Sequence, residues 1–291
     1  MASSTKDPVI SIVIPNYQGG NTLPDCLTSI VKQNYQQSEI IVIDGASTDN
    51  SVDVIHNFES HISNWVSEPD LGQADALNKG FAQATGDIWG WLCSDDILLP
   101  ETLPWVADFF VKHPNVDMVI GAVEMEYTNE PDRNFTFYPP KDAMDMLPSH
   151  NGIIQPGCFW RASAIKRSPP IDASYCYAMD NELWCYLKKE GASATITQRV
   201  LSRFIQDGQN KTSSGGKAIG HELDRLYRAY SHDFIPLSFW YRNFRYPFEC
   251  LFGRRRGWWR LALLRPIQLL YMILLSPFYG YKRVRRMSWP D

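Results

Sequence analysis

The first hundred residues alternate regularly between short apolar runs and helical patterns, and this alternation most constrains the fold. The runs at 9–14, 39–43, 65–66 and 88–93 are rich in β-branched or aromatic residues and are predicted to be strands. Between them, apolar residues recur at helical spacing over 23–31, 52–58 and 74–81. Right-handed crossovers between parallel strands need helices on both faces of the sheet. The sequence therefore predicts an α/β fold with a doubly wound, mostly parallel sheet.

The pattern is less regular after residue 96. We predict a helix over 103–110, a strand over 117–123 and another helix around 183–187, shortly after Met179 and Asp180. The segment 124–150 is rich in Pro, Asn, Asp and Met and is predicted to be an irregular excursion. Residues 206–216 (QDGQNKTSSGG) are predicted to form a polar loop. We find no internal repeats.

Acidic side chains follow two of the predicted strands, at the sheet edge where such folds bind ligands. Asp95 and Asp96 follow the fourth strand, and two adjacent carboxylates suit Mg²⁺ or Mn²⁺. No nitrogen or sulfur ligand set for zinc is evident from the spacing of the residues. The alternative is an acidic turn that caps the helix after Pro100. Asp44 ends the second strand beside Gly45, where a carboxylate can accept a hydrogen bond from a base or a ribose.

The cysteines and the N-terminal residues indicate the cellular compartment in which the protein is expected to lie. The six cysteines show no CxxC or Cys/His spacing, so we expect reduced core residues in a protein that faces the cytosol. Residues 1–8 are polar and lack the apolar core of a secretory signal. We therefore expect the main domain to remain in the cytoplasm.

The last fifty residues differ from the rest in charge. Residues 241–291 hold eleven Lys and Arg against two acidic residues, a balance of +9, whereas the whole chain carries −4. The apolar run 261–280 is interrupted by Arg265, Pro266 and Pro277. Its apolar residues gain about 3 to 6 kcal/mol in a bilayer, and a central Arg costs about 3 kcal/mol before the prolines count. We expect a monotopic helix or hairpin on an anionic membrane face, or alternatively a helix packed on the main domain or at a dimer interface.

Four motifs resemble, in the same order, those of the family-2 glycosyltransferases. They are IVIPNY at 12–17, IDGASTD at 43–49, GQADALNKG at 72–80 and CSDD at 93–96. The likeness covers residues 8–215 and implies a GT-A fold. It also implies that a set of residues contacts the nucleotide or the donor sugar: Pro15, Asn16, Tyr17, Asp44, Asp75, Asn78 and Ser94. Asp95 and Asp96 would hold the metal, with Asp96 as the direct ligand, although the motif has Ser94 where the family pattern has Asp.

The same resemblance implies residues for the acceptor side and for catalysis. MDNELW at 179–184 is similar to the family's Glu-Asp-x-x-Leu-Trp signature and makes Asp180 the general base, with Glu182 as an alternative or supporting group. Alternatively, Asp180 is an acidic residue at the N-cap or in the first turn of a helix, where the helix dipole favours negative charge. Gln155 and Trp160 resemble acceptor-side residues, and Trp160 is equally suited to the core. Arg203 and Lys211 resemble lid cations over the diphosphate, or else solvated loop charges.

Together these features predict a metal-dependent inverting glycosyltransferase. We expect a catalytic domain over 1–235, with a nucleotide-sugar half at 8–123 and an acceptor half at 124–235, and a membrane-associating tail over 236–291. The expected donor is a UDP-sugar, and the acceptor is a lipid-linked or cell-surface glycan at the cytoplasmic face of a membrane. We expect no nucleic-acid partner and leave a homo-oligomer open. The rival hypotheses are a sugar-phosphate nucleotidyltransferase and an inactive membrane-bound scaffold on the same fold.

Overall fold

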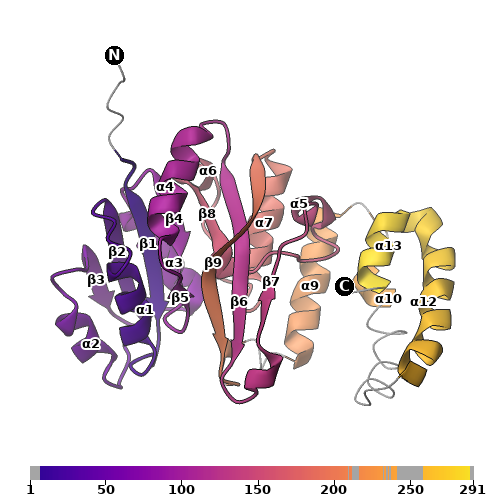
Figure 1. Ribbon diagram of the computed structural model, residues 1–291, viewed down its shortest axis with the longest axis horizontal. Helices are drawn as coiled ribbons and strands as arrows, with labels where there is room; N and C mark the ends of the chain where they lie inside the picture. Colours follow the sequence, from indigo (N-terminus) through magenta and orange to yellow (C-terminus); the bar gives the residue numbers. More distant parts are fainter. Residues whose placement is uncertain are drawn as a thin grey trace. The chain divides into compact units, whose positions relative to one another are not determined.

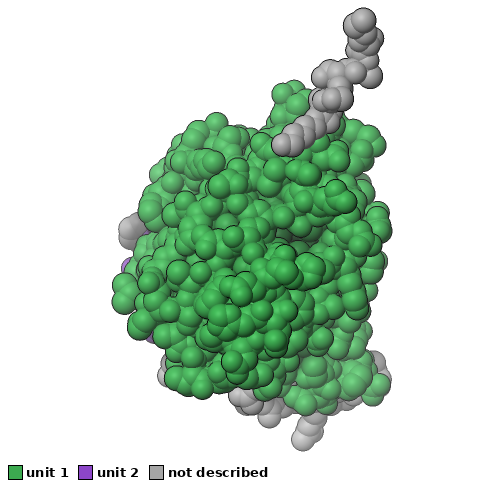
Figure 2. Space-filling model, turned by 90° about the vertical axis from the view of Figure 1, so that its left-hand side faces the viewer, with its two compact units in different colours: residues 1–141, 153–215 green, residues 142–152, 216–291 purple. Residues whose placement is uncertain are grey.

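The computed structural model describes residues 7–208, 210–211, 216–231, 233, 235, 237–240 and 258–288. The chain divides into two compact units, which are coloured separately in Figure 2. Unit 1 comprises residues 1–141 and 153–215, and unit 2 comprises residues 142–152 and 216–291. Unit 1 contains all the motifs described above.

Unit 1 is built on a nine-stranded sheet (Figure 1). Its order is β3 (Asn64–Ser67), β2 (Ser38–Asp44), β1 (Ile10–Asn16), β4 (Ile88–Trp91), β8 (Cys158–Arg161), β6 (Met118–Tyr127), β9 (Ala194–Gln206) and β5 (Ile97–Leu98), with β7 (Phe135–Phe137) pairing β6. The strands β3, β2, β1 and β4 are all parallel. Antiparallel pairs enter with β8, whereas β6 and β9 run parallel. The prediction of an α/β sheet wound from the N-terminal strands is confirmed.

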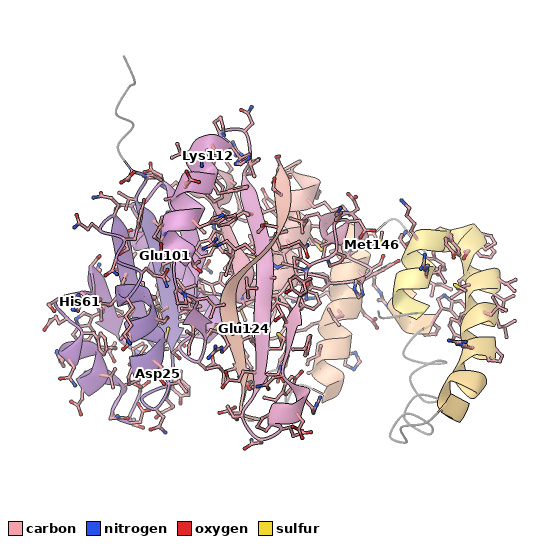
Figure 3. The ribbon with its side chains drawn as sticks, in the orientation of Figure 1. Asp25, His61, Glu101, Lys112, Glu124 and Met146 are labelled. Atoms are coloured by element: carbon pink, nitrogen blue, oxygen red, sulfur yellow. The ribbon has the colours of Figure 1, made fainter. Side chains whose placement is uncertain are left out.

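Helices cover both faces of this sheet. On one face Ile12 and Val42 belong to a core cluster with Leu27 of α1 (Leu23–Val31), Ile55 of α2 (Ser51–Asn57) and Leu103 of α4 (Thr102–Lys112). Figure 3 marks α4 with Glu101 just before it and Lys112 at its end.

The opposite face is covered by α3 (Gln73–Gln83) and α7 (Met179–Lys189). A Cβ at Gly80 of α3 would lie 2.3 Å from Val13 of β1, so glycine allows the helix to approach the sheet closely. Trp184 of α7 packs against Trp91 and Trp160, which also contact Phe81 of α3. A short helix, α6 (Ala162–Ile165), follows β8, and single 3₁₀ turns occupy Pro131–Arg133 and Gln155–Gly157.

Two segments differ from the sequence-based expectation. The strand β6 continues through Tyr127, β7 lies at 135–137 and the helix α5 (Ala143–Met146) follows, so 124–150 is not irregular throughout. The thirteen-residue strand β9 was not predicted at all. Most of its side chains are half-buried or exposed, and it therefore lacks the apolar run that marks a buried strand. Its pairing with β6 stabilises it instead.

Unit 2 contains α5, α9 (Gly216–Tyr230), α10 (Leu237–Trp240), α12 (Trp258–Tyr279) and α13 (Tyr281–Ser288). Tyr227, Leu237, Leu275 and Val284 form its buried cluster. Arg283 of α13 forms an ion pair with Asp233. Because α9 packs with the later helices, the compact units divide at 215/216 rather than at the predicted 235/236. Among the described residues no helix is both long and apolar enough to cross a bilayer.

Candidate functional site

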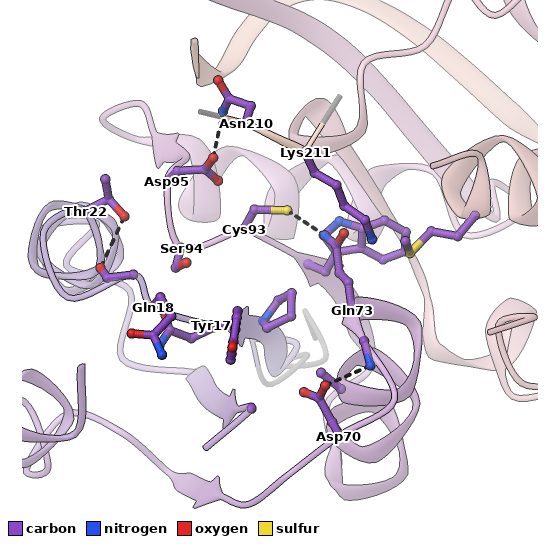
Figure 4. A pocket seen from close by; sticks show the side chains of 18 of the residues that line it. Tyr17, Gln18, Thr22, Asp70, Gln73, Cys93, Ser94, Asp95, Asn210 and Lys211 are labelled. Atoms are coloured by element: carbon purple, nitrogen blue, oxygen red, sulfur yellow. Dashed lines mark hydrogen bonds between the residues drawn. The ribbon is translucent and has the colours of Figure 1, made fainter. Parts of the chain in front are cut away.

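A large cleft lies in unit 1 at the carboxyl ends of the parallel strands, with a volume of about 1070 Å³ (Figure 4). Eight of the residues singled out in the sequence line it: Pro15, Asn16, Tyr17, Ser94, Asp95, Gln155, Asp180 and Lys211. These residues come from β1, the loop after β4, the turn before β8, α7 and the segment after β9. The fold thus brings together positions that are nearly two hundred residues apart in the chain.

The strands β1, β2 and β3 end beside one wall of the cleft, and their last residues are in register. Asn16 pairs with Asp44, and Asp44 pairs with Ser67. The Asp44 carboxylate accepts hydrogen bonds from Asn16 Nδ2 at 2.7 Å, from Ser67 Oγ at 2.6 Å, and from the Ser47 amide at 2.9 Å and hydroxyl at 2.6 Å. These bonds hold the ends of the three strands and the loop after β2 in one arrangement.

This network shows where the predicted base-contacting residue Asp44 lies. Its side chain is 0% exposed and does not line the cleft, because four donors of the protein already surround the carboxylate. Its neighbours Asn16, Tyr17 and Gly45 do line the cleft, and the Tyr17 side chain is 69% exposed there. Asp44 therefore positions the residues that a bound base would meet.

A candidate metal site lies at the end of β4. The Cys93 Sγ and one carboxylate oxygen each of Asp95 and Asp96 lie within 4.8 Å of one another. Asp96 is 0% exposed, and neither of its oxygens has a hydrogen-bond partner in the structure. A buried carboxylate without partners is costly unless a cation neutralises it. The donor set therefore fits a divalent cation.

Burial is the main influence on the ionisation of this cluster. Burial, and next the Asp95 carboxylate, raise the pKa of Asp96 well above its usual range, while the backbone N–H of Ile205 acts in the opposite direction without full hydrogen-bond geometry. Burial also raises the pKa of Asp95, which the Asn210 side chain partly offsets. Burial and the two carboxylates raise the pKa of the Cys93 thiol. A bound cation would reverse these shifts because it favours the ionised forms.

Asp180 lies in the first turn of α7 and lines the same cleft as Asp95. The helix begins at Met179, so the Asp180 side chain sits at the end of the helix that favours negative charge. The backbone N–H of Asn181 donates to it at 2.7 Å. Burial nevertheless raises the pKa of Asp180 to about 6. A carboxylate with this pKa is ionised at neutral pH and can still accept a proton, as a general base requires.

Glu182 lies two residues further along α7 and does not line the cleft. A separation of two residues turns a side chain by more than half of the helix circumference. The geometry therefore favours Asp180 over Glu182 as the group that faces a substrate.

The chain segment after β9 closes one side of the cleft. Asn210 Nδ2 donates to Asp95 Oδ2 and to the Ile205 carbonyl, both at 2.8 Å, as Figure 4 shows for Asp95. The Lys211 ammonium lies 5.9 Å from the centre of the Tyr177 ring, and both residues line the cleft. Lys211 is thus the cation that this segment brings to the cleft.

Arg203, the other predicted lid cation, does not lie in the cleft with Lys211. It pairs with Glu124 at 2.9 Å and with Glu126 at 3.2 Å, two residues of the neighbouring strand β6, and does not line the cleft. These ion pairs link β9 with β6, and a lid cation at Arg203 stays a prediction.

Three further residues from the motifs lie behind the cleft rather than in it. Asp75 accepts from the Leu71 amide and pairs with Lys79. The Asn78 side chain forms two hydrogen bonds with the backbone of Ile171. It accepts one from the N–H at 2.8 Å and donates one to the carbonyl at 2.9 Å. Trp160 is 0% exposed within the aromatic core, which matches the core alternative given for it in the sequence analysis.

Sequence reasoning missed several residues of the cleft, among them Gln73, Cys176, Tyr177, Asp207 and Asn210. Gln73 is the second residue of the third motif, and its place at the start of a helix at the sheet edge was a usable signal. Asn210 lies next to Lys211 in the polar segment, but nothing local indicated its bond to Asp95.

Comparison with known proteins relates this arrangement to enzymes. A family model described as glycosyl transferase family 2 matches residues 11–168. A PGL/p-HBAD biosynthesis glycosyltransferase of Mycobacterium tuberculosis is 36% identical over 126 residues, 42% of this chain and 49% of that protein. The glycosyltransferase GlyG of Streptococcus pneumoniae is 36% identical over 135 residues, 45% of this chain and 43% of that protein. The matches thus span about half the length of these curated relatives.

Solved structures show the same fold over nearly the whole chain. The structure of S. aureus TarS 1-349 in complex with UDP has a TM-score of 0.62 at 14% identity, covering 96% of this chain and 86% of that one. The mannosyltransferase PcManGT from Pyrobaculum calidifontis in complex with GDP-Man and Mn²⁺ has a TM-score of 0.63 at 15% identity, covering 98% and 86%. Because the family model covers more than half of the residues, including the four strand-end motifs, the chain belongs to glycosyl transferase family 2.

Proposed function

We propose that this chain transfers a sugar from a nucleotide diphosphate sugar to an acceptor hydroxyl with inversion at the anomeric carbon. Asp180 is the general base. The acceptor oxygen forms a bond to the anomeric carbon while the bond from that carbon to the diphosphate oxygen breaks. The acceptor proton passes to Asp180, and the bonding electrons leave with the diphosphate.

The observation that carries this proposal is that Asp180 and Asp95 line the same cleft and suit different tasks. Asp180 suits proton transfer, and Asp95 suits metal binding. Asp180 combines a pKa of about 6 with access to the cleft, which suits proton transfer near neutral pH. Asp95 and Asp96 bring two carboxylates together, and among the described residues the Asp96 oxygens have no hydrogen-bond partner. The pairing of a base with a separate acidic cluster argues against an inactive scaffold. The nucleotidyltransferase alternative loses support with the family assignment.

Asp95 and Asp96 would hold Mg²⁺ or Mn²⁺. When bound, the cation would neutralise charge on the donor diphosphate and on the leaving group. Lys211 and the amide of Asn210 would add positive charge and a hydrogen-bond donor at the same side of the cleft.

The proposed donor is a UDP-sugar. Tyr17 is exposed in the cleft beside Asn16, so its ring is available to stack on a base. Support also comes from S. aureus TarS, whose structures include complexes with UDP and with UDP-GlcNAc.

Nucleotide release from a panel of nucleotide sugars, measured with and without a chelator, tests the proposal. We expect release from a UDP-sugar with Mn²⁺ or Mg²⁺, and its loss in EDTA or in Asp96→Asn. The Asp108→Asn variant is a matched control, because it removes an exposed acidic group on α4 that has no predicted role at the site and does not line the cleft. Full activity of Asp96→Asn in the presence of EDTA would rule out the metal-dependent reaction.

The proposed acceptor is a lipid-linked or cell-surface glycan, and the proposed place of work is the cytoplasmic face of an anionic membrane. The support comes from unit 2. Leu269, Leu270, Ile273, Leu274 and Phe278 of α12 are each more than half exposed. They cover one side of the helix, whereas Tyr271, Met272, Leu275 and Tyr279 on the other side pack into the unit's own cluster.

An anionic lipid surface is the partner that matches both the apolar side and the charge of these helices. Residues 258–288 contain no Asp or Glu and six Lys or Arg residues, and Lys282 and Arg285 are exposed. Two copies of this segment would repel each other through these charges, whereas anionic headgroups attract them. The part of α12 over 269–279 carries apolar residues on both sides, so the side that the protein leaves uncovered needs a second apolar environment.

A further inference from the structure

The candidate metal site contains a sulfur atom that the spacing of the cysteines in the sequence did not reveal. No CxxC pair is present, so a thiol ligand was not expected at the sheet edge. The structure nevertheless brings the Cys93 Sγ within 4.8 Å of oxygens of both Asp95 and Asp96. Cys93 and Asp95 are two residues apart just beyond β4 and both line the cleft.

Two glutamine side chains hold the thiol in place. Gln73 Nε2 donates to Cys93 Sγ at 3.1 Å, and the thiol in turn lies 3.9 Å from Gln155 Oε1. Gln155 is itself fixed by donation to the Trp91 carbonyl at 2.9 Å. A hydrogen bond donated to sulfur orients it and stabilises negative charge on it, as second-shell partners of metal ligands do.

An independent observation indicates that a cation belongs here. Asp96 is fully buried, and both of its carboxylate oxygens lack hydrogen-bond partners in the structure. Its oxygen lies in the same cluster as the Cys93 sulfur. A ligand bound between them would therefore be positively charged and in reach of sulfur and oxygen together.

We propose that Cys93 Sγ is a direct ligand of the divalent cation, which gives this site a mixed sulfur and oxygen donor set. The inference rests on the metal site of the proposed function. On binding, the S–H bond breaks, the sulfur–metal bond forms and the proton leaves to solvent. Sulfur favours the softer divalent ions, so the site binds Co²⁺, Zn²⁺ and Mn²⁺ in preference to Mg²⁺.

A Co²⁺ titration of the full-length protein tests this without any measurement of activity. A cobalt–thiolate bond gives a charge-transfer band in the near ultraviolet. We expect the band in the wild type and in Cys176→Ser, a matched control because Cys176 also lines the cleft. Cys93→Ser should lose the band and weaken Co²⁺ binding at least about tenfold, since even an outer-shell partner contributes that much. By calorimetry, Cys93→Asp should still bind metal and should shift the Mn²⁺ to Mg²⁺ affinity ratio toward Mg²⁺.

The outcomes separate this inference from the proposed function. A band that persists in Cys93→Ser, or disappears only in Cys176→Ser, overturns the role of Cys93. Tight Co²⁺ binding with no band in the wild type also overturns it, while the carboxylate metal site stands. If neither Co²⁺ nor Mn²⁺ binds the wild type, with or without UDP, the metal site of the proposed function fails and the inference fails with it.

Discussion

At the scale of single residues, Asp180 combines two opposing influences. The start of α7 and the Asn181 amide favour its ionised form, but burial dominates and raises its pKa to about 6. We expect Asp180→Asn to lower turnover at least about a hundredfold while donor binding changes little, because the amide keeps the shape but cannot accept the proton. Glu182→Gln, two residues away and outside the cleft, is the matched control and should stay within a few-fold of wild type. A large loss in Glu182→Gln with little change in Asp180→Asn would reverse the two roles.

The raised pKa of Asp180 also predicts how activity and stability depend on pH. Turnover should fall about tenfold per pH unit below about pH 6, as the base becomes protonated. In folding, a carboxyl whose pKa rises from 3.8 to about 6 binds its proton more tightly in the native state, so its ionisation destabilises the fold as pH rises through this window. At pH 7 the neutral Asp180→Asn variant should therefore melt at a higher temperature than wild type. An equal or lower melting temperature, measured without metal or nucleotide, would contradict the role of burial.

At the scale of elements, the segment after β9 carries Asn210, which contacts Asp95 of the candidate metal site. Asn210 bridges Asp95 and the Ile205 carbonyl, and the Asp207 amide donates to its side chain at 3.1 Å. We expect Asn210→Ala to raise the concentration of Mn²⁺ needed for half-maximal activity several-fold, with a small change in stability because the side chain lies near the surface of the cleft. The variant Asn129→Ala, which removes a bond to Asp207 on the outer side of the same segment, is a control. Equal effects of the two variants would indicate a general loosening of the segment rather than a contact with the site.

At the scale of the whole molecule, the proposed membrane contact depends on the exposed side of α12 and the charges of α13. Full-length protein should sediment with anionic vesicles, and Ile273→Asp should weaken this binding strongly, because it places a charge in the contact. Val111→Asp, a similar change at a half-exposed position of unit 1, should bind as wild type does. The double variant Lys282→Glu and Arg285→Glu should weaken binding to anionic vesicles, at about 1 kcal/mol for each removed positive charge, and salt should weaken binding in the same way. Binding that is equally strong to neutral vesicles, or absent altogether, would contradict an anionic lipid partner.

The sequence by itself determined the parallel N-terminal half of the sheet and the edge at which the site would lie. The strands β1, β2 and β4 are buried on both faces, so each appears as a continuous apolar run, and the helices between them carry one apolar face. Since these signals are local, they placed Asp95 at this edge, and the resemblance to the family implied Asn16 and Ser94. The family motifs then indicated Asp180, and the structure places it in the same cleft.

Only the tertiary structure decided which of these side chains reach the cleft. Asp44 and Trp160 carry motif identities, yet hydrogen bonds from neighbouring strands and aromatic packing bury them. Nothing local in the sequence indicated that Asn210 and Cys93 belong to the candidate metal site. Asn210 reaches Asp95 from the segment after β9, which pairs with β6. Two glutamines from separate elements hold the Cys93 thiol. The pKa of Asp180 likewise depends on its burial in the folded chain. Local periodicity depends on neighbours within a few residues, whereas burial and hydrogen bonding at the site depend on contacts across more than a hundred.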